Sequence, residues 1–376
     1  MRLGPAGRRP EAGAAVHPVL RAGLAIGLAL LLASVLFWAS GADPLAAYRV
    51  MFGYAFANPS GLVASLHRAI YLAFCTSAFL VPLRAGLWNI GLPGQVYAGT
   101  LAAYAIPFAL GLHEPTPGAP TLPVPLLMAL AAAAAGAALG GFVGFLRARM
   151  QVNEILVTMM LNSALFWIVS DFIKEGGPFM SATAEGESFN LPDPLRPALW
   201  VGLPPTALVA LVAAAAVDFV FSRTAAGYRV RAFGLNPRAA RYAGIDPVRV
   251  SVGVFVVGGA LAGLAGYHYF AAVPGLYKIP TNYGYYGDLS FYGIICGLIA
   301  RGSALRALPM ALLFAGLSLG GRFAQGALRL PFGVDYAILG LLMTTFVATH
   351  LLDRSRLRLL PSRLAQPAGT HAEGAP

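Results

Sequence analysis

Residues 222–250 read SRTAAGYRVRAFGLNPRAARYAGIDPVRV. Long apolar runs flank this stretch on both sides, at 200–221 and at 250–273. The stretch itself carries six arginines and a single acidic residue. Two apolar runs of membrane-spanning length, joined by a basic segment, predict a membrane protein that has this loop on its cytoplasmic side.

The basic segment also contains the signals of a short helix of its own. Asn236 suits the N-cap, Pro237 suits the first helical position, and Gly244 suits a left-handed stop. A basic loop that holds its own capped helix indicates a docking element for a cytoplasmic partner. The arginines alone would also fit the ordinary excess of positive charge on the cytoplasmic side.

The composition supports a membrane protein. Of the 376 residues, 58% are hydrophobic and 11% are charged, which leaves too little polar surface for a soluble domain. Apolar runs of roughly 18–25 residues, long enough to cross a hydrocarbon core of about 30 Å, recur along the chain. The sequence therefore predicts an all-α polytopic fold of about ten transmembrane helices, with eight or nine still open because the eighth and ninth candidates are short. The candidates are 20–40, 62–82, 86–112, 122–147, 155–173, 200–221, 250–273, 289–300, 307–321 and 334–352.

The basic residues predict the orientation in the membrane. With a cytoplasmic N-terminus, 19 of the 26 lysines and arginines fall in cytoplasmic segments. This positive-inside bias accounts for the net charge of +11 without nucleic acid. We expect a multi-pass protein of the inner (plasma) membrane with both termini cytoplasmic. Its parts are a cytoplasmic N-terminal segment (1–19), a transmembrane domain (20–352) with the cytoplasmic loop 222–249, and a disordered cytoplasmic tail (353–376).

Signatures of enzymes and cofactor sites are missing from the sequence. A Walker A loop needs Gly-Lys followed by Ser or Thr, whereas the two lysines, Lys174 and Lys278, are followed by Glu and Ile. The six histidines lack the spacing of metal ligands, and no nucleophile elbow is found. We therefore expect no catalytic residue, no metal site and no cofactor. Cys75 and Cys296 fall in apolar spans and are expected to be small buried residues.

Residues 85–95, AGLWNIGLPGQ, interrupt an apolar span with three glycines and a proline. Backbone groups freed at membrane depth are tolerated only where protein or a water-filled cavity satisfies them. Asn89 and Gln95 place polar side chains at this point. Two interpretations stay open: a discontinuous helix that lines a solute path, or a cytoplasmic turn that precedes the third span.

Residues 153–162, NEILVTMMLN, begin the fifth predicted span. Glu154, Thr158 and Asn162 recur every four residues, so they fall within one arc of a helix. Ionisable residues in or near a span usually face the protein interior and serve function. We predict that Asn153 caps this helix and that Glu154 and Asn162 face inward. Asp218, near the inner end of the sixth span, is predicted to be a solvated terminus.

Two weaker patterns lie around residues 283–292. A G-x-x-G-polar motif occurs at 91–95 and again at 284–288, which suggests two inverted five-helix halves. Aromatic residues also gather at 283–292. An interfacial aromatic belt is the commoner explanation, and a stacking surface for a nucleobase or a sugar is the alternative.

Three segments carry a family resemblance: GLWNIGLPGQ at 86–95, NEILVTMMLN at 153–162, and GYRVRAFGLNPRAARYAGI at 227–245, followed by GGALAGLAG at 258–266. In this order they resemble the permease subunits of ABC importers of the branched-chain amino acid and ribose type. The resemblance covers about residues 60–345. The second segment is most similar to the branch that serves nucleosides and simple sugars. Residues 284–303 depart from the family pattern with Asp288 and extra aromatic residues, which leaves the solute open.

The resemblance implies a permease that forms the path for a small solute, with ATP hydrolysis on separate chains. A nucleoside or simple sugar is expected; a branched-chain amino acid permease or an ion-coupled secondary transporter is the alternative. The implied partners are cytoplasmic ABC ATPase subunits, a second permease chain in a heterodimer, and an external substrate-binding lipoprotein. The candidate path residues are Asn89, Gln95, Glu154, Thr158 and Asn162. The candidate ATPase-coupling residues are Gly234, Asn236, Pro237, Ala239, Ala240, Arg241 and Gly244.

Overall fold

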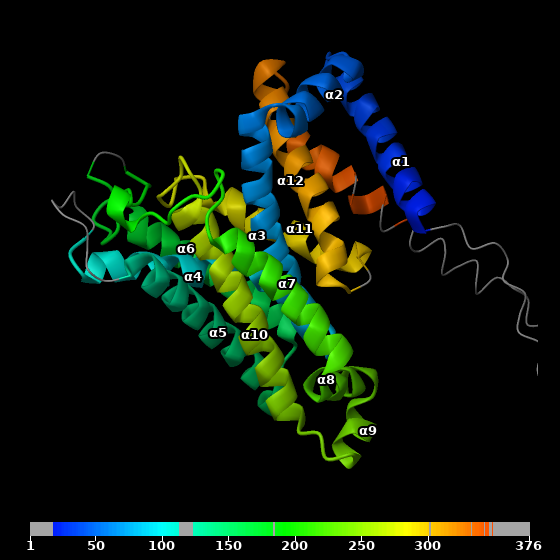
Figure 1. Cartoon of the computed structure of the whole chain (residues 1–376), viewed down its shortest axis with the longest axis vertical. Coiled ribbons are helices and arrows are strands. Elements are labelled where there is room, and N and C mark those ends of the chain that lie inside the picture. The colour runs from blue at the N-terminus through cyan, green and yellow to red at the C-terminus, as the bar shows by residue number, and fades with distance from the viewer. Residues whose placement is uncertain are drawn as a thin grey trace, which may run out of the picture. The chain divides into compact units, whose positions relative to one another are not determined.

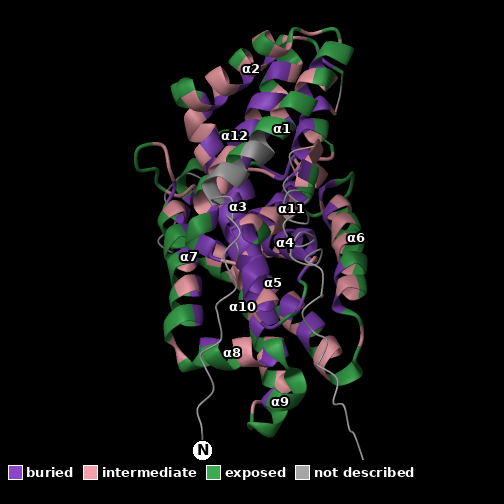
Figure 2. Ribbon diagram, turned by 90° about the vertical axis from the view of Figure 1, so that its right-hand side faces the viewer, coloured by how far each residue is buried: buried purple, intermediate pink, exposed green. Residues whose placement is uncertain are grey.

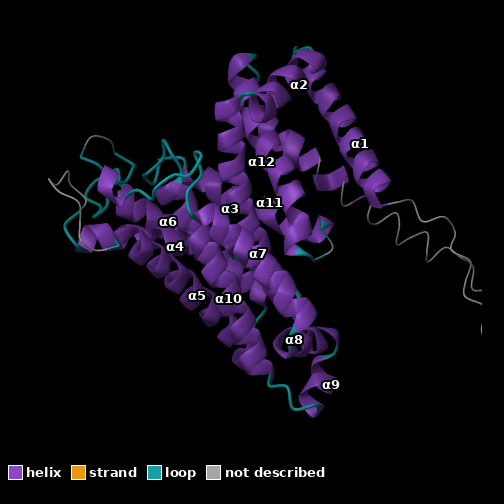
Figure 3. Ribbon diagram, in the orientation of Figure 1, coloured by secondary structure: helices purple, strands orange, loops and turns teal. Residues whose placement is uncertain are grey.

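The computed structural model describes residues 18–112, 123–182, 185–300, 302–331, 333–341, 343–345 and 348. This part of the chain consists of helices and the loops that join them (Figure 3). Outside the helices, two isolated β-bridges are formed, between Met180 and Ser188 and between Trp200 and Leu203. The predicted disordered tail, and all but the last two residues of the predicted N-terminal segment, lie outside the described residues.

Helices occupy the predicted apolar segments. The α-helices are α1 (Pro18–Ala39), α2 (Pro44–Phe52), α3 (Pro59–Leu83), α4 (Leu92–Ala109), α5 (Val124–Met150), α6 (Glu154–Ile173), α7 (Thr206–Arg223), α8 (Ala225–Leu235), α9 (Pro237–Tyr242), α10 (Pro247–Tyr267), α11 (Tyr283–Ile299) and α12 (Ala304–Ala327). Two π-helical turns, η1 (Gly53–Ala57) and η3 (His268–Ala272), and a 3₁₀ turn, η2 (Asp193–Leu195), are also formed. A shorter apolar helix follows at Val334–Thr345. The chain forms two compact units. One comprises residues 48–324, and the other is formed by the segments before and after it.

Six described helices are long and apolar enough to cross a membrane: α3, α5, α6, α7, α10 continued by η3, and α12. The number rises to seven if residues 27–39 and 44–57 are counted as one broken span. The chain is therefore an all-helical, multi-pass membrane protein. Helices α4 and α11 coincide with two more of the predicted segments but are not among these six.

Helices α5 and α10 run against each other in the larger unit and make the most extensive contact among its described helices (Figures 1 and 2). Glycines allow this approach. A Cβ atom on Gly259 would lie 2.1 Å from the carbonyl oxygen of Gly136, and one on Gly140 would lie 2.1 Å from that of Phe255. Small residues at helix interfaces allow the backbones of membrane helices to approach this closely.

The long polar loop between α6 and α7 is joined by hydrogen bonds to the loop that precedes α11. The amide of Ser188 donates to the carbonyl of Ile279 (2.9 Å), and the amide of Leu191 donates to the carbonyl of Tyr277 (2.8 Å). Lys278 forms an ion pair with Glu187. These contacts join two loops that are about ninety residues apart in sequence, at the end of the helices opposite to α8 and α9 (Figure 1).

Replacing Gly259 by alanine tests the packing of α5 on α10. The added methyl group would meet the backbone of Gly136, so we expect a loss of about 1–3 kcal/mol in stability. Gly253 is the matched control, because it lies on the same helix with nothing within 4 Å of an added Cβ. The measurement is thermal unfolding of the purified protein. Equal melting temperatures for Gly259→Ala and Gly253→Ala would contradict the packing argument.

Candidate functional site

The polar stretch at 85–95 is a connection between two helices. Helix α3 ends at Leu83 and α4 begins at Leu92, so the segment 84–91 joins them as a turn and loop. The predicted third span, 86–112, was therefore wrong at its start. The segment is as apolar as a membrane span. Its first apolar side chains, such as those of Ala85 and Leu87, belong to a loop and are buried within the protein.

Asn89 and Gln95 bind each other. Asn89 Nδ2 donates to Gln95 Oε1 (2.9 Å), and Gln95 Nε2 donates to Asn89 Oδ1 (3.1 Å). Asn89 Oδ1 also accepts the amide of Gly91 at 3.2 Å. Both side chains are almost completely buried. This amide pair closes the loop onto the first turn of α4.

Helix α6 supplies the second set of contacts to the loop. Asn162 Oδ1 accepts the amide of Gly94 (2.8 Å), and its Nδ2 donates to the carbonyl of Ile90 (3.0 Å). Thr158 packs close to Gly91, where a Cβ would lie 2.9 Å from its side chain. The hydroxyl of Thr158 donates to the carbonyl of Glu154 at 2.7 Å. One face of α6 thus provides hydrogen-bond partners for backbone groups that no helix or sheet satisfies.

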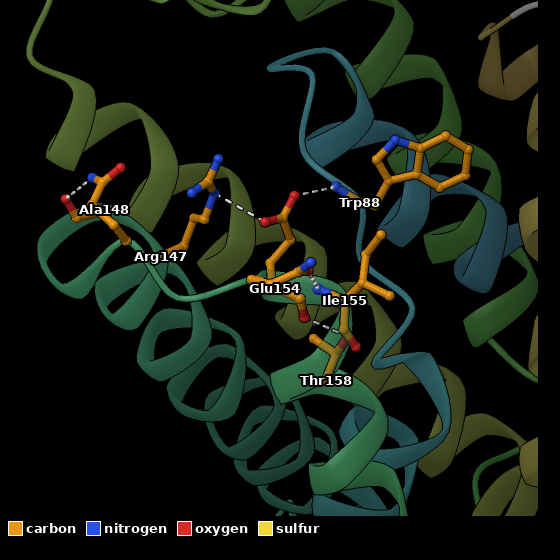
Figure 4. Close-up of polar contacts among 8 residues, drawn as sticks. Trp88, Arg147, Ala148, Glu154, Ile155 and Thr158 are labelled. Atoms are coloured by element: carbon orange, nitrogen blue, oxygen red, sulfur yellow. Dashed lines mark hydrogen bonds and ion pairs between the residues drawn. The ribbon is translucent and has the colours of Figure 1, made fainter.

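Glu154 links three segments at the start of α6 (Figure 4). Its Oε2 pairs with Arg147 Nε at the end of α5 (2.9 Å), and its Oε1 accepts the amide of Trp88 in the loop (3.4 Å). The Glu154 side chain is 11% exposed. Asn153 caps the helix as predicted, because its side chain accepts the amide of Ile155 at 2.9 Å. The five candidate path residues therefore gather around one loop.

The predicted helix in the basic loop is present as α9. Asn236 Oδ1 accepts the amides of Arg238 and Ala239, both at 3.1 Å, and Pro237 is the first helical residue. Gly244 has a φ of +79°, the left-handed stop that the sequence predicted. Of the candidate coupling residues in α9, Ala240 is buried and Ala239 and Arg241 are exposed.

A second helix, α8, precedes α9 and was not predicted from the sequence. Thr224 caps it by accepting the amide of Gly227 at 3.1 Å. We call α8 and α9 together the coupling element. It lies at the lower end of the larger unit, and much of its surface is exposed (Figures 1 and 2). Leu235 and Tyr242 are 88% and 95% exposed.

Gly234 joins the coupling element to the loop 84–91. A Cβ on Gly234 would lie 2.6 Å from the carbonyl oxygen of Arg84 and 3.0 Å from the amide nitrogen of Gly86. Gly86 itself has a φ of +73°, which favours glycine. A groove of about 480 Å³ borders this contact, and its walls include Arg147, Arg238 and Arg241. The coupling group thus touches, through Gly234, the loop around which the candidate path residues gather.

Several predictions about other side chains need correction. Asp218 is not a solvated terminus. Its oxygens accept the hydroxyl of Ser303 (2.6 Å) and the amides of Ala304 (2.9 Å) and Leu305 (3.1 Å), so it caps α12. The aromatic cluster does not form an exposed belt, because Tyr283, Tyr286 and Tyr292 are buried within the protein.

The predicted buried thiols are confirmed, since Cys75 and Cys296 are both fully buried. Among the described residues, no group of three or more His, Cys, Asp or Glu side chains is placed to hold a metal ion. The polar contacts of the site therefore come from amides, hydroxyls and backbone groups, with the Arg147–Glu154 pair as their charged member.

Comparisons with known proteins place this geometry in a family. The family described as branched-chain amino acid transport system, permease component, matches residues 61–347. A glucose ABC transporter permease of Haloferax volcanii is 31% identical in an alignment of 370 positions that covers 93% of each chain. A nucleoside ABC transporter permease of Lactococcus lactis is 29% identical, over 79% of this chain and 82% of that one. A guanosine ABC transporter permease of Bacillus subtilis is 28% identical, over 82% and 85%. No solved structure matches the chain.

The chain belongs to this family of ABC importer permeases. It is the non-catalytic, membrane-embedded component of such an importer. Membership confirms the resemblance carried by the three sequence segments, and it displaces the ion-coupled secondary transporter as an alternative.

Replacing Glu154 by glutamine tests the contacts in Figure 4. The change keeps the side-chain shape but removes the charge that pairs with Arg147, and we expect a loss of about 1–3 kcal/mol in stability. Glu175→Gln is the matched control, because Glu175 is exposed in the insert after α6. The measurement is thermal unfolding of the purified chain. If Glu154→Gln and the control melted at the same temperature, the Arg147–Glu154 pair would not stabilise the protein.

Proposed function

We propose that this permease imports a nucleoside or a simple sugar, and that the coupling element transmits the movement of its ATPases to the loop 84–91. The observation that carries the mechanism is the contact of Gly234 with the backbone of residues 84–86. A glycine at this position lets the two backbones touch. Movement of α8 and α9 would therefore act directly on the loop that the polar cluster holds.

The proposed partners follow from the family. ATPase subunits would bind the exposed tip of the coupling element, where Leu235 and Tyr242 offer apolar surface beside the arginines of α9. Apolar anchors surrounded by charge are typical of stable interfaces. A second permease chain, in a heterodimer, and an external substrate-binding lipoprotein would complete the importer. The lipoprotein would bind near the joined loops that follow α6 and precede α11.

The proposed topology places the coupling element in the cytoplasm. Ten spans would then place both termini on the same side, with 1–19 and 353–376 as cytoplasmic ends of the permease domain 20–352. The motifs at 91–95 and 284–288 support two inverted halves, because they lie at or near the starts of α4 and α11. The positive-inside bias of the sequence supports the same orientation.

The proposed solute path borders the polar cluster. Asn89, Gln95, Glu154, Thr158 and Asn162 hydrogen-bond within the protein, so we infer that they shape the inner end of the path and hold its loop in place. Direct solute contacts would then be few, as expected if an external binding protein selects the solute. The names of the three relatives favour glucose or nucleosides, whereas the description of the family favours branched-chain amino acids as the alternative.

Alanine at Leu235 and Tyr242 tests the docking proposal. We expect the double variant to lose ATPase copurification, because removing a buried anchor from an interface costs about 2 kcal/mol or more, roughly thirtyfold in affinity. Leu208→Ala is the matched control, since Leu208 is an exposed apolar residue on α7. The measurement is copurification of co-expressed ATPase subunits, followed by ATP-driven uptake of labelled guanosine, glucose and leucine.

Each outcome has a meaning. Loss of the ATPase in the double variant alone supports docking through the coupling element. Retention of the ATPase in all three proteins would place the interface elsewhere. Uptake of leucine without guanosine or glucose would overturn the proposed solute while leaving the docking proposal intact.

A further inference from the structure

A second groove, of about 700 Å³, lies between α7, α8 and α10. We call it the lateral groove. Its volume falls within the roughly 300–1,000 Å³ of small-molecule sites. Two of its walls belong to helices long and apolar enough to cross a membrane, and its third wall belongs to the coupling element. The lateral groove thus joins apolar helix surface to the basic loop.

The walls of the lateral groove are mainly apolar. Val217, Phe221 and Val254 are buried and lie toward its inside, whereas Val220 and Val257 are 37% and 48% exposed. A chain of methylene groups that covered these side chains would gain about 25 cal/mol for each Å² of apolar surface removed from water. The groove therefore suits a hydrocarbon chain.

Positive charge lies at the rim of the same groove. Arg229 and Arg249 both line it, and both are exposed. Among the described residues, Arg229 forms no ion pair, and Arg249 pairs only at 3.4 Å with Asp246. One oxygen of Asp246 is already used to cap α10, because it accepts the amide of Val248 at 2.8 Å. The rim therefore carries net positive charge.

We propose that the lateral groove binds an anionic phospholipid of the cytoplasmic leaflet. Its acyl chain would lie against α7 and α10, and its phosphate would lie between Arg229 and Arg249. Basic pockets between transmembrane helices on the cytoplasmic side are suited to anionic headgroups. The leaflet follows from the orientation under the proposed function, so this inference rests on that proposal.

A lipid in this place also touches the link between α9 and α10. Residues 243–246 also line the groove, and they connect the end of the coupling element to α10. The occupied groove would hold this link in one position. The lipid composition of the membrane would thereby change how well ATP hydrolysis drives transport, without touching the solute path.

Two variants test the headgroup contact and the acyl-chain contact separately. Arg229→Gln with Arg249→Gln removes the rim charge, and Arg223→Gln is its control because Arg223 is exposed nearby but does not line the groove. Gly253→Leu fills the groove, since an added Cβ there meets nothing within 4 Å. Gly27→Leu is its control, an equally open glycine in α1.

The measurement is native mass spectrometry of the purified full chain titrated with phosphatidylglycerol or with phosphatidylcholine. We expect tighter binding of phosphatidylglycerol, reduced about fivefold for each arginine removed. We expect Gly253→Leu to abolish binding of both lipids at this site, and both controls to bind like the unchanged chain. ATPase copurification of the same proteins reports the proposed function separately.

Three results would overturn the inference. Equal binding of the two lipids by the unchanged chain would show that the groove does not recognise an anionic headgroup. Unchanged binding in both groove variants would place the lipid elsewhere. A dimer of this chain that Gly253→Leu disrupts would make the groove a protein interface. If lipid binding behaves as expected but no ATPase copurifies, the lipid site stands and the proposed function fails.

Discussion

Inside a membrane protein, backbone N–H and C=O groups that lie outside a helix need hydrogen-bond partners from the protein itself. Residues 84–91 are the place where this chain meets that constraint, because α3 ends at Leu83 and the next helix begins at Leu92. The amide of Gly94, the carbonyl of Ile90 and the amide of Trp88 find their partners on α6. The polar residues at the start of α6 are explained by this need.

The same loop is in backbone contact with the coupling element. Side chains of α6 hold it on one side, and Gly234 presses against residues 84–86 on the other. A loop packed in this way moves when its neighbours move, because close-packed contacts have low compressibility and transmit displacement. The structure thus offers a short route from the coupling element to the loop 84–91 and on to α6, whose position Arg147 and Glu154 help to fix.

Local rules allowed the sequence to predict the parts of the site that depend on neighbouring residues. Asn236, Pro237 and Gly244 act as N-cap, first residue and left-handed stop because capping is decided within a few residues. The NEILVTMMLN segment likewise predicted that Glu154 and Asn162 face inward. The same rules could have found α8, since Thr224 is a good capping residue ahead of it.

Other parts of the site depend on residues far away in the sequence, and these were missed. Asp218 caps α12, which begins about 85 residues later, so its neighbours gave no sign of that role. Gly234 was among the candidate coupling residues, but its backbone contact with residues about 150 positions earlier could not be predicted from its neighbours in the sequence. The start of the third span was misplaced because hydropathy cannot distinguish a buried loop from a helix.

The central claim is that the Gly234 contact transmits movement from the ATPases to the loop. The most direct measurement is ATP hydrolysis and solute uptake, side by side, by the reconstituted importer carrying Gly234→Ala. The added Cβ would lie 2.6 Å from the carbonyl oxygen of Arg84 and must separate the two backbones. We predict that the ATPases remain bound and hydrolyse ATP, while the amount of solute taken up per ATP falls several-fold. Uptake per ATP equal to that of the unchanged importer would contradict the claim.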